Sequence, residues 1–274
     1  MKIRQTIITL FIVLTAIASL NAQDTLLIYQ TGGSIIRKAI LDIDSITFYA
    51  AVLPTDTTVV ADIDGNIYKT VVIGEQTWMA ENLRVTTFND GTEIPLITNA
   101  SEWYQLRTPA YCYYSNDSAG YHGLYGPLYN WYSVNTGQLC PAGWHIPTDE
   151  EWTIMQDFLI ANGYNFDGAT TGNNISKSLA DTIFWTYSSV EGAVGNTDYP
   201  AFRNKSGFSA LPGGYRNEGG TFIRTLLRGY WWSSTQYIDD PESSWYRELR
   251  YDTTYVFVNI AKQWMGFSVR CIED

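Results

Sequence analysis

The segment Cys140–Trp152, with the sequence CPAGWHIPTDEEW, constrains the fold most, because a cysteine closely precedes a well-marked helix start. Thr148 is a favourable N-cap, and Glu151 three residues later completes the capping-box pattern. The first turn is acidic, as the helix dipole favours. Apolar residues then recur at helical spacing, at Trp152, Met155, Phe158 and Leu159. The pattern predicts a helix over residues 148–163, ended by Gly163, with a cysteine at its entrance.

The first residues of the chain have the layout of a secretory signal peptide. Lys2 and Arg4 precede an apolar run over residues 7–18, and small residues follow up to Ala22. The run is shorter than the roughly 20 residues of a spanning helix, and no later stretch approaches that length. We therefore expect cleavage after residue 22 and an exported protein without a membrane span, in the periplasm, at the cell surface or outside the cell.

The charge balance argues against polyanionic partners. The chain has 17 Lys and Arg against 28 Asp and Glu, a net charge of −11, and residues 1–22 contribute two of the positive charges. Binding to nucleic acid requires a basic face that displaces counterions from phosphates. We therefore expect no nucleic-acid partner and no attraction to anionic membranes.

The rest of the chain divides into a short segment, a linker and a main domain. Residues 23–50 contain short β-rich runs but are too few to form a stable core. Residues 51–61 form an extended linker, and the main domain spans residues 62–274. An Asp-Gly hairpin opens this domain, helices are expected at 125–136 and 148–163, and Gly-rich and aromatic strands follow beyond about residue 195. This order predicts an α+β fold with mostly antiparallel sheets.

The three cysteines, Cys112, Cys140 and Cys271, suggest one disulfide and one remaining thiol in an oxidising compartment. Three pairings are open. We expect Cys140 to pair with Cys271, which would tie the last strand to the start of the predicted helix. Cys112 lies between tyrosines and is expected to be a small buried residue.

Metal and cofactor sites are not expected. The stretch DIDGN, beginning at Asp62, resembles the first half of a calcium loop, but the later glutamate is missing at the required spacing. His122 and His145 are the only histidines, and neither forms a short zinc-binding pair with a cysteine. A Cys140–His145 nucleophile pair would be excluded by a disulfide at Cys140.

Four motifs together resemble one known family. CPAGWHIPTDEEW, FSALPGGYRNEGGTF, GYWWSST and GFSVRCIED are similar, in order and spacing, to the Fibrobacter succinogenes major paralogous domain family. The resemblance covers roughly residues 62–274. The segment DIDSITF resembles a leader that often precedes such domains in exported bacterial proteins.

That family in turn resembles the formylglycine-generating sulfatase-modifying enzymes, whose fold is a variant of the C-type lectin fold. The matching motifs are YNWY at 129–132, IPTDEEW at 146–152 and GFSVR at 266–270. The resemblance implies a C-type lectin-like variant with two helices. The paired, copper-binding catalytic cysteines of those enzymes have no counterpart here, and the calcium and sugar tripeptides of true C-type lectins are absent. The resemblance therefore carries a fold but no mechanism.

Two classes of function follow. The first is a non-catalytic exported recognition or cell-surface module that binds a glycan or a surface protein through aromatic loops. The candidate ligand-binding residues are Tyr215, Arg216, Asn217, Glu218, Tyr237 and Trp245. The second is an enzyme related to the formylglycine-generating oxidases, which would need a free cysteine of low pKa. A passive structural component of the cell surface is a third hypothesis.

Overall fold

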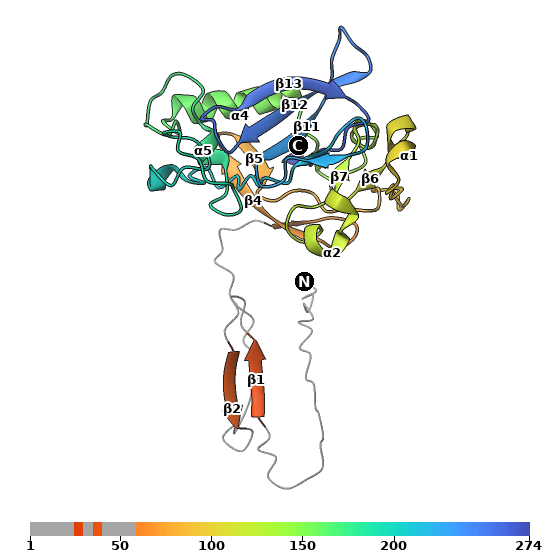
Figure 1. Ribbon diagram of the computed structural model, residues 1–274, viewed down its shortest axis with the longest axis horizontal. Coiled ribbons are helices and arrows are strands. Elements are labelled where there is room, and N and C mark those ends of the chain that lie inside the picture. The colour runs from red at the N-terminus through yellow and green to blue at the C-terminus, as the bar shows by residue number, and fades with distance from the viewer. Residues whose placement is uncertain (1–24, 30–34, 40–58) are drawn as a thin grey trace. The chain divides into compact units, whose positions relative to one another are not determined.

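The computed structural model describes residues 25–29, 35–39 and 59–274, and the chain divides into two units at residues 53 and 54 (Figure 1). In the first unit, β1 (Thr25–Tyr29) and β2 (Ile35–Ala39) pair antiparallel. The predicted β-rich character of residues 23–50 is therefore confirmed at these two strands. The predicted signal peptide, the run SITFYA and most of the predicted linker lie outside the described residues.

The second unit contains the remaining elements. Its helices are α1 (Ala100–Gln105), α2 (Ser118–Tyr121), α3 (Trp131–Val134), α4 (Asp149–Ala161) and α5 (Ser176–Leu179), with 3-10 turns at Tyr114–Asn116 and Pro200–Phe202. Its strands are β3 (Val59–Ala61), β4 (Ile67–Ile73), β5 (Gln76–Met79), β6 (Tyr111–Cys112), β7 (Leu128–Tyr129), β8 (Trp144–His145), β9 (Tyr215–Arg216), β10 (Phe222–Ile223), β11 (Arg228–Gln236), β12 (Ser243–Arg250), β13 (Phe257–Lys262) and β14 (Ile272–Glu273).

The largest sheet has five strands in the order β3-β4-β5-β14-β8, and every neighbouring pair is antiparallel. The predicted Asp-Gly turn connects β3 to β4, and Gly65 there adopts a φ of 82°, which glycine tolerates without strain. The last strand of the chain, β14, lies between β5 and β8. Strands that are far apart in the sequence are therefore hydrogen-bonded neighbours inside this sheet.

A second sheet is the predicted C-terminal meander, in the order β11-β12-β13 with antiparallel pairing (Figure 1). Two further pairs, β6-β7 and β9-β10, complete the sheets of the described chain. The expected α+β architecture with mostly antiparallel sheets is confirmed.

Helix α4 confirms the strongest local prediction. The Thr148 hydroxyl accepts a hydrogen bond from the Glu151 amide, and the Glu151 side chain accepts one from the Thr148 amide, at 3.2 and 2.7 Å. The apolar face of α4 packs against both sheets in one buried cluster, which includes Trp78, Trp152 and Trp231. Helix α4 therefore contacts both sheets and connects them through one buried cluster.

Three expectations about the elements are wrong. Residues 125–136 form the short strand β7 and the single turn α3 rather than a helix, because Tyr129 pairs with Phe267 across the chain. The described residues contain five helices, four of them with six residues or fewer, instead of two. Residues 59–61, placed in the linker, form β3 and pair with β4.

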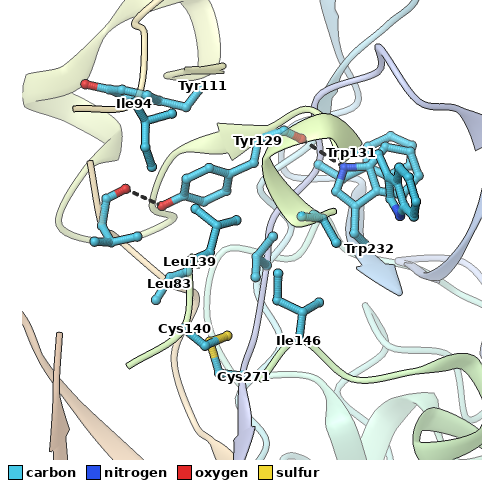
Figure 2. Close-up of a cluster of buried hydrophobic side chains, with 14 of the residues drawn as sticks. Leu83, Ile94, Tyr111, Tyr129, Trp131, Leu139, Cys140, Ile146, Trp232 and Cys271 are labelled. Atoms are coloured by element: carbon cyan, nitrogen blue, oxygen red, sulfur yellow. Dashed lines mark hydrogen bonds between the residues drawn. A yellow bond between two sulfur atoms is a disulfide. The ribbon is translucent and has the colours of Figure 1, made fainter. Parts of the chain in front are cut away.

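A second buried cluster holds the disulfide and two rings of the YNWY motif, those of Tyr129 and Trp131 (Figure 2). The Tyr129 hydroxyl donates to the Val85 carbonyl at 2.6 Å, and the Trp232 indole donates to the Tyr129 carbonyl at 2.9 Å. Burying these rings therefore leaves their polar atoms paired, as a buried polar group requires.

The disulfide links Cys140 to Cys271, with the two Cα atoms 5.9 Å apart. The predicted pairing is confirmed. Cys112 remains free and is fully buried. The bond joins the segment that leads into α4 to the residue directly before β14, the strand between β5 and β8.

Candidate functional site

The segment Cys140–Trp152 acts as a structural joint. The two ring nitrogens of His145 contact two carboxylates, Glu151 at 2.8 Å and Asp274 at 2.7 Å. Glu151 is also the capping residue of α4, so His145 connects the helix entrance to the terminal strand. The residues that raised the question of a metal or catalytic centre are thus engaged in holding α4, β8 and β14 together.

The structure places the sequence-predicted ligand residues unequally. Arg216 is completely buried, and its guanidinium donates to the carbonyls of Ile97, Thr98 and Gly220. It also lies over the Trp103 ring, at 4.5 Å from the centroid. Arg216 therefore fastens the loop before α1 and is closed to a ligand, which corrects its assignment as a contact residue.

The other five candidates remain at least partly accessible. Tyr215 is half-buried against Tyr230, and Asn217 closes the turn that it begins by accepting from the Thr221 amide. Glu218 is exposed at that turn. Tyr237 and Trp245 contact each other edge-on, with ring centroids 5.3 Å apart.

These candidates do not form one site. Tyr215 packs on Tyr230, which contacts Tyr246 of β12 across the same face of the β11-β12-β13 sheet. Trp245 directly precedes Tyr246 in β12, so its side chain points to the opposite face. The structure therefore separates the Tyr215–Glu218 loop from the Tyr237–Trp245 pair.

A different candidate site is a hollow of about 220 Å³ formed by five segments that are distant in sequence. Its polar lining residues are Lys69, Glu81, Asn82, Asp181 and Ser209. Its other lining residues are Ala80, Gly123, Leu124, Ile183 and Leu211. Carboxylates, an ammonium, an amide and a hydroxyl thus meet apolar surface in one concavity, which is the usual composition of a small-ligand site.

The base of the hollow is held rigidly by Asn82. Its side-chain oxygen accepts hydrogen bonds from the Trp231 indole at 2.9 Å and from Arg270 Nε at 3.1 Å. Its amide nitrogen donates to the Tyr125 carbonyl at 2.9 Å. Arg270 is fully buried and donates further to main-chain carbonyls at residues 208 and 209. This network fixes the lining before any ligand arrives.

The rim of the hollow exposes large apolar side chains. Leu124 and Ile183 line it, and Phe184 follows Ile183 with its ring against Tyr125. Ile183 and Phe184 are 46% and 47% exposed. Phe184 also adopts a φ of 67°, in the left-handed region that non-glycine residues rarely occupy. Such backbone strain clusters at functional sites.

Sequence reasoning missed this site. Its residues come from five places in the chain: strand β4, the segment after β5, the pair Gly123 and Leu124, and two loops near residues 181 and 210. Within one sequence, the only signal was the aromatic run IFWTY at 183–187, where Tyr187 is also exposed.

Residues 71–273 match the Fibrobacter succinogenes major domain. The chain belongs to this family. No curated protein and no solved structure matches the chain.

The described part of this Fibrobacter succinogenes major domain protein offers no ready metal centre. No group of three or more His, Cys, Asp or Glu residues is arranged to hold an ion in residues 59–274. In the DIDGN loop, Asp62 accepts from the Asn66 amide and the Tyr68 hydroxyl, while Asp64 accepts from Thr86. The Asp62 carboxylate therefore closes the β3-β4 turn, and the Asp64 carboxylate ties that turn to the segment after β5.

The three cysteines of this family member comprise one disulfide and one buried free thiol. Cys140 and Cys271 are joined to each other, and burial raises the pKa of the Cys112 thiol to about 12. Cys112 is therefore protonated at neutral pH and cannot act as the low-pKa thiolate of an oxidase.

The helices of the described residues are too short or too polar to span a membrane.

The His145 joint gives a pH-dependent prediction. Burial lowers the pKa of His145, but its hydrogen bonds to Asp274 and Glu151 outweigh burial, so the net pKa is raised. A raised pKa means that the protonated bridge stabilises the fold fully below about pH 6.5, and that this contribution is lost as the pH rises through the folded-state pKa. Replacing His145→Asn should therefore lower the free energy of unfolding by roughly 1 kcal/mol at pH 5.5 and by less at pH 8.5.

Urea unfolding of both proteins at the two pH values measures this difference. Asp274→Asn should reduce the same pH-dependent difference, because it removes one of the two carboxylates. A cost of His145→Asn that is equal at pH 5.5 and 8.5 would show that the ring only fills space.

Proposed function

We propose that this protein is an exported, non-catalytic recognition module that binds carbohydrate in the hollow between Lys69, Glu81 and Asp181. The observation that carries the proposal is the lining itself, which combines charged acceptors, a charged donor and apolar surface. Sugars present many hydroxyls, each of which both donates and accepts, beside apolar ring faces. Such a ligand can satisfy all three kinds of lining residue at once.

The size and charge of the hollow support a sugar unit over other small ligands. A volume of about 220 Å³ is below the roughly 300–1,000 Å³ of sites for drug-sized ligands, and it suits one ring-sized group. Glu81 and Asp181 disfavour an anion inside, while Lys69 disfavours a cation. A neutral, polyhydroxylated ring meets neither penalty.

The fold is consistent with such a role. We propose that this fold is a variant of the C-type lectin architecture. It consists of two antiparallel sheets, the bridging helix α4 and long irregular loops, and such a rigid frame can carry ligand-binding residues on its loops. The disulfide and the buried network around Asn82 keep that frame in one conformation. Preorganisation of this kind reduces the ordering cost of binding.

The competing proposals have less support. An oxidase related to the formylglycine-generating enzymes would need a reactive thiol, and burial of Cys112 and the Cys140–Cys271 bond leave none. A surface module that recognises a protein would use the exposed apolar rim but has no need for the polar base. A passive structural component would need neither.

The test is a glycan array of neutral oligosaccharides probed with the purified full chain and two double variants. Asp181→Ala with Ile183→Ala removes one acceptor and one apolar contact from the hollow. Asp157→Ala with Ile154→Ala is the matched control, because it removes the same residue types from the exposed side of α4. We expect the hollow variant to lose at least tenfold in affinity for the glycans that bind, and the control variant to retain full affinity.

Two outcomes would contradict the proposal. The first is an array with no bound neutral glycan. The second is equal binding by the hollow variant and the control. Retained binding by the control, together with an unchanged unfolding midpoint in both variants, ensures that a loss reports on the hollow and not on folding.

A further inference from the structure

A second cluster of polar side chains lies on the β11-β12-β13 sheet. Arg228 and Arg250 are directly opposite each other on β11 and β12. Both contact the same carboxylate oxygen of Glu248, at 2.9 and 2.7 Å, and Arg250 Nη2 reaches the other oxygen at 3.1 Å. Glu248 is almost completely buried, whereas each arginine side chain is about one quarter exposed.

This arrangement has an excess of positive charge. Like charges placed opposite each other in a sheet are destabilising unless a counter-charge offsets them. One carboxylate neutralises only one guanidinium, so the triad of Arg228, Glu248 and Arg250 is net positive. Arg224, which is exposed, adds a further positive charge nearby along the chain, because the Arg228 amide donates to the Arg224 carbonyl at 3.0 Å.

The cluster also has flat aromatic surface. The Arg250 guanidinium lies 3.5 Å from the centroid of the Phe257 ring, and Phe257 contacts Tyr255 at 4.4 Å between centroids. Tyr255 is 42% exposed. The Arg228 guanidinium also interacts with the Tyr230 hydroxyl. Two guanidiniums, each on a side chain about one quarter exposed, thus lie on the same sheet as the exposed ring of Tyr255 and the ring of Phe257.

The cluster adjoins the hollow through the segment Arg224–Leu227. The Leu226 amide donates to the Pro212 carbonyl, next to the hollow residue Leu211, and the Leu226 carbonyl accepts from Thr186. At the other end, the Leu227 carbonyl accepts from Tyr251, the neighbour of Arg250. Arg224 and Leu226 both have positive φ, at 71° and 62°, so this connecting backbone is held in a strained form.

We propose that the Arg228–Arg250 pair is a second subsite, which binds the carboxylate of an acidic sugar unit next to the sugar in the hollow. The inference rests on the proposed function and specifies its ligand class, an oligosaccharide that contains uronate. Guanidinium forks match planar carboxylates, and the pair is already oriented by Glu248. The exposed Tyr255 ring offers a face on which a sugar ring can pack. An acidic peptide would use the same donors, but it would leave the hollow's hydroxyl-binding set unused.

The experiment compares three uronate oligosaccharides, made from galacturonate, guluronate and glucuronate, with their carboxyl-reduced neutral forms. Calorimetry with the full chain should show at least one acidic oligomer binding about tenfold more tightly than its reduced form at low salt. Arg250→Gln and Arg228→Gln should each abolish most of this difference while leaving affinity for the reduced form unchanged. Arg107→Gln is the matched control, because it removes the same charge from an exposed arginine that packs on Trp264 instead.

The outcomes separate the two proposals. Equal affinity for all three acidic and reduced pairs, or a difference that survives Arg250→Gln and Arg228→Gln, would overturn the subsite. Poly-glutamate binding as tightly as the best uronate, with the same dependence on Arg250, would replace the sugar by an acidic peptide and overturn it as well. If the Asp181→Ala with Ile183→Ala variant binds every oligosaccharide as tightly as the unmodified chain does, that result would instead count against the hollow, and the arginine comparison would be unaffected.

Discussion

Replacing Cys140 and Cys271 together by serine is expected to lower the free energy of unfolding by up to about 5 kcal/mol, because the disulfide closes a span of 131 residues. In the chain-entropy model, removing the bond restores conformational entropy to the unfolded chain and so favours the unfolded state. Both sulfur atoms are buried, so serine hydroxyls in their place would be removed from water, which adds the cost of burying a polar group. A loss of this size is comparable to the total stability of many domains.

Urea unfolding of the oxidised chain, the reduced chain and the double variant measures the effect. Cys112→Ala is the control, since it removes a buried sulfur without opening a loop and should cost roughly 1 kcal/mol. If the double variant costs no more than this control, the disulfide does not provide the main restraint on the fold.

Replacing Asn82→Ala is expected to cost roughly 4 kcal/mol, because three buried groups lose their partner at once. The Trp231 indole, Arg270 Nε and the Tyr125 carbonyl all bond to this side chain. Each buried polar group left unpaired costs about 1–3 kcal/mol, and more for a charged one. The charge is the larger concern here, because burial lowers the pKa of Arg270, whose bonded partners in the described part of the chain include no carboxylate.

Thermal and urea unfolding of Asn82→Ala test this value. Asn162→Ala is the matched control, because Asn162 is exposed at the end of α4 and makes one side-chain bond to that helix. It should cost less than 1 kcal/mol. A similar small cost at Asn82 would mean that water replaces the lost partners and that the base of the hollow is not rigid.

Local signals in the sequence identified the parts of the fold that local physics controls. The capping box at Thr148 and Glu151 set the start of α4, and alternation and turn residues set β11 to β13. The helix expected at 125–136 failed because its residues have stronger partners elsewhere. The Trp131 amide bonds to Gln263, and Asn130 bonds to Thr108 and Ala110.

The candidate sites were harder to derive, because burial of charged residues is decided by distant segments. Arg216 was expected at a surface loop, yet it meets carbonyls at residues 97 and 98, more than 110 positions away. Lys177 is buried in the same way, with its ammonium bonded to Asp198 and to the carbonyl of Asn196. The hollow combines five segments, and only the complete fold shows that they are neighbours.

The position of β14 between β5 and β8 bears on how the protein is made. The ribosome releases β5 and β8 well before Ile272–Glu273, so the position between these two strands stays unfilled until β14 emerges. Oxidation of Cys140 to its native partner must wait for the same segment. The pairing of β5 and β8 with their shared neighbour and the closing of the disulfide therefore belong to one late step of folding.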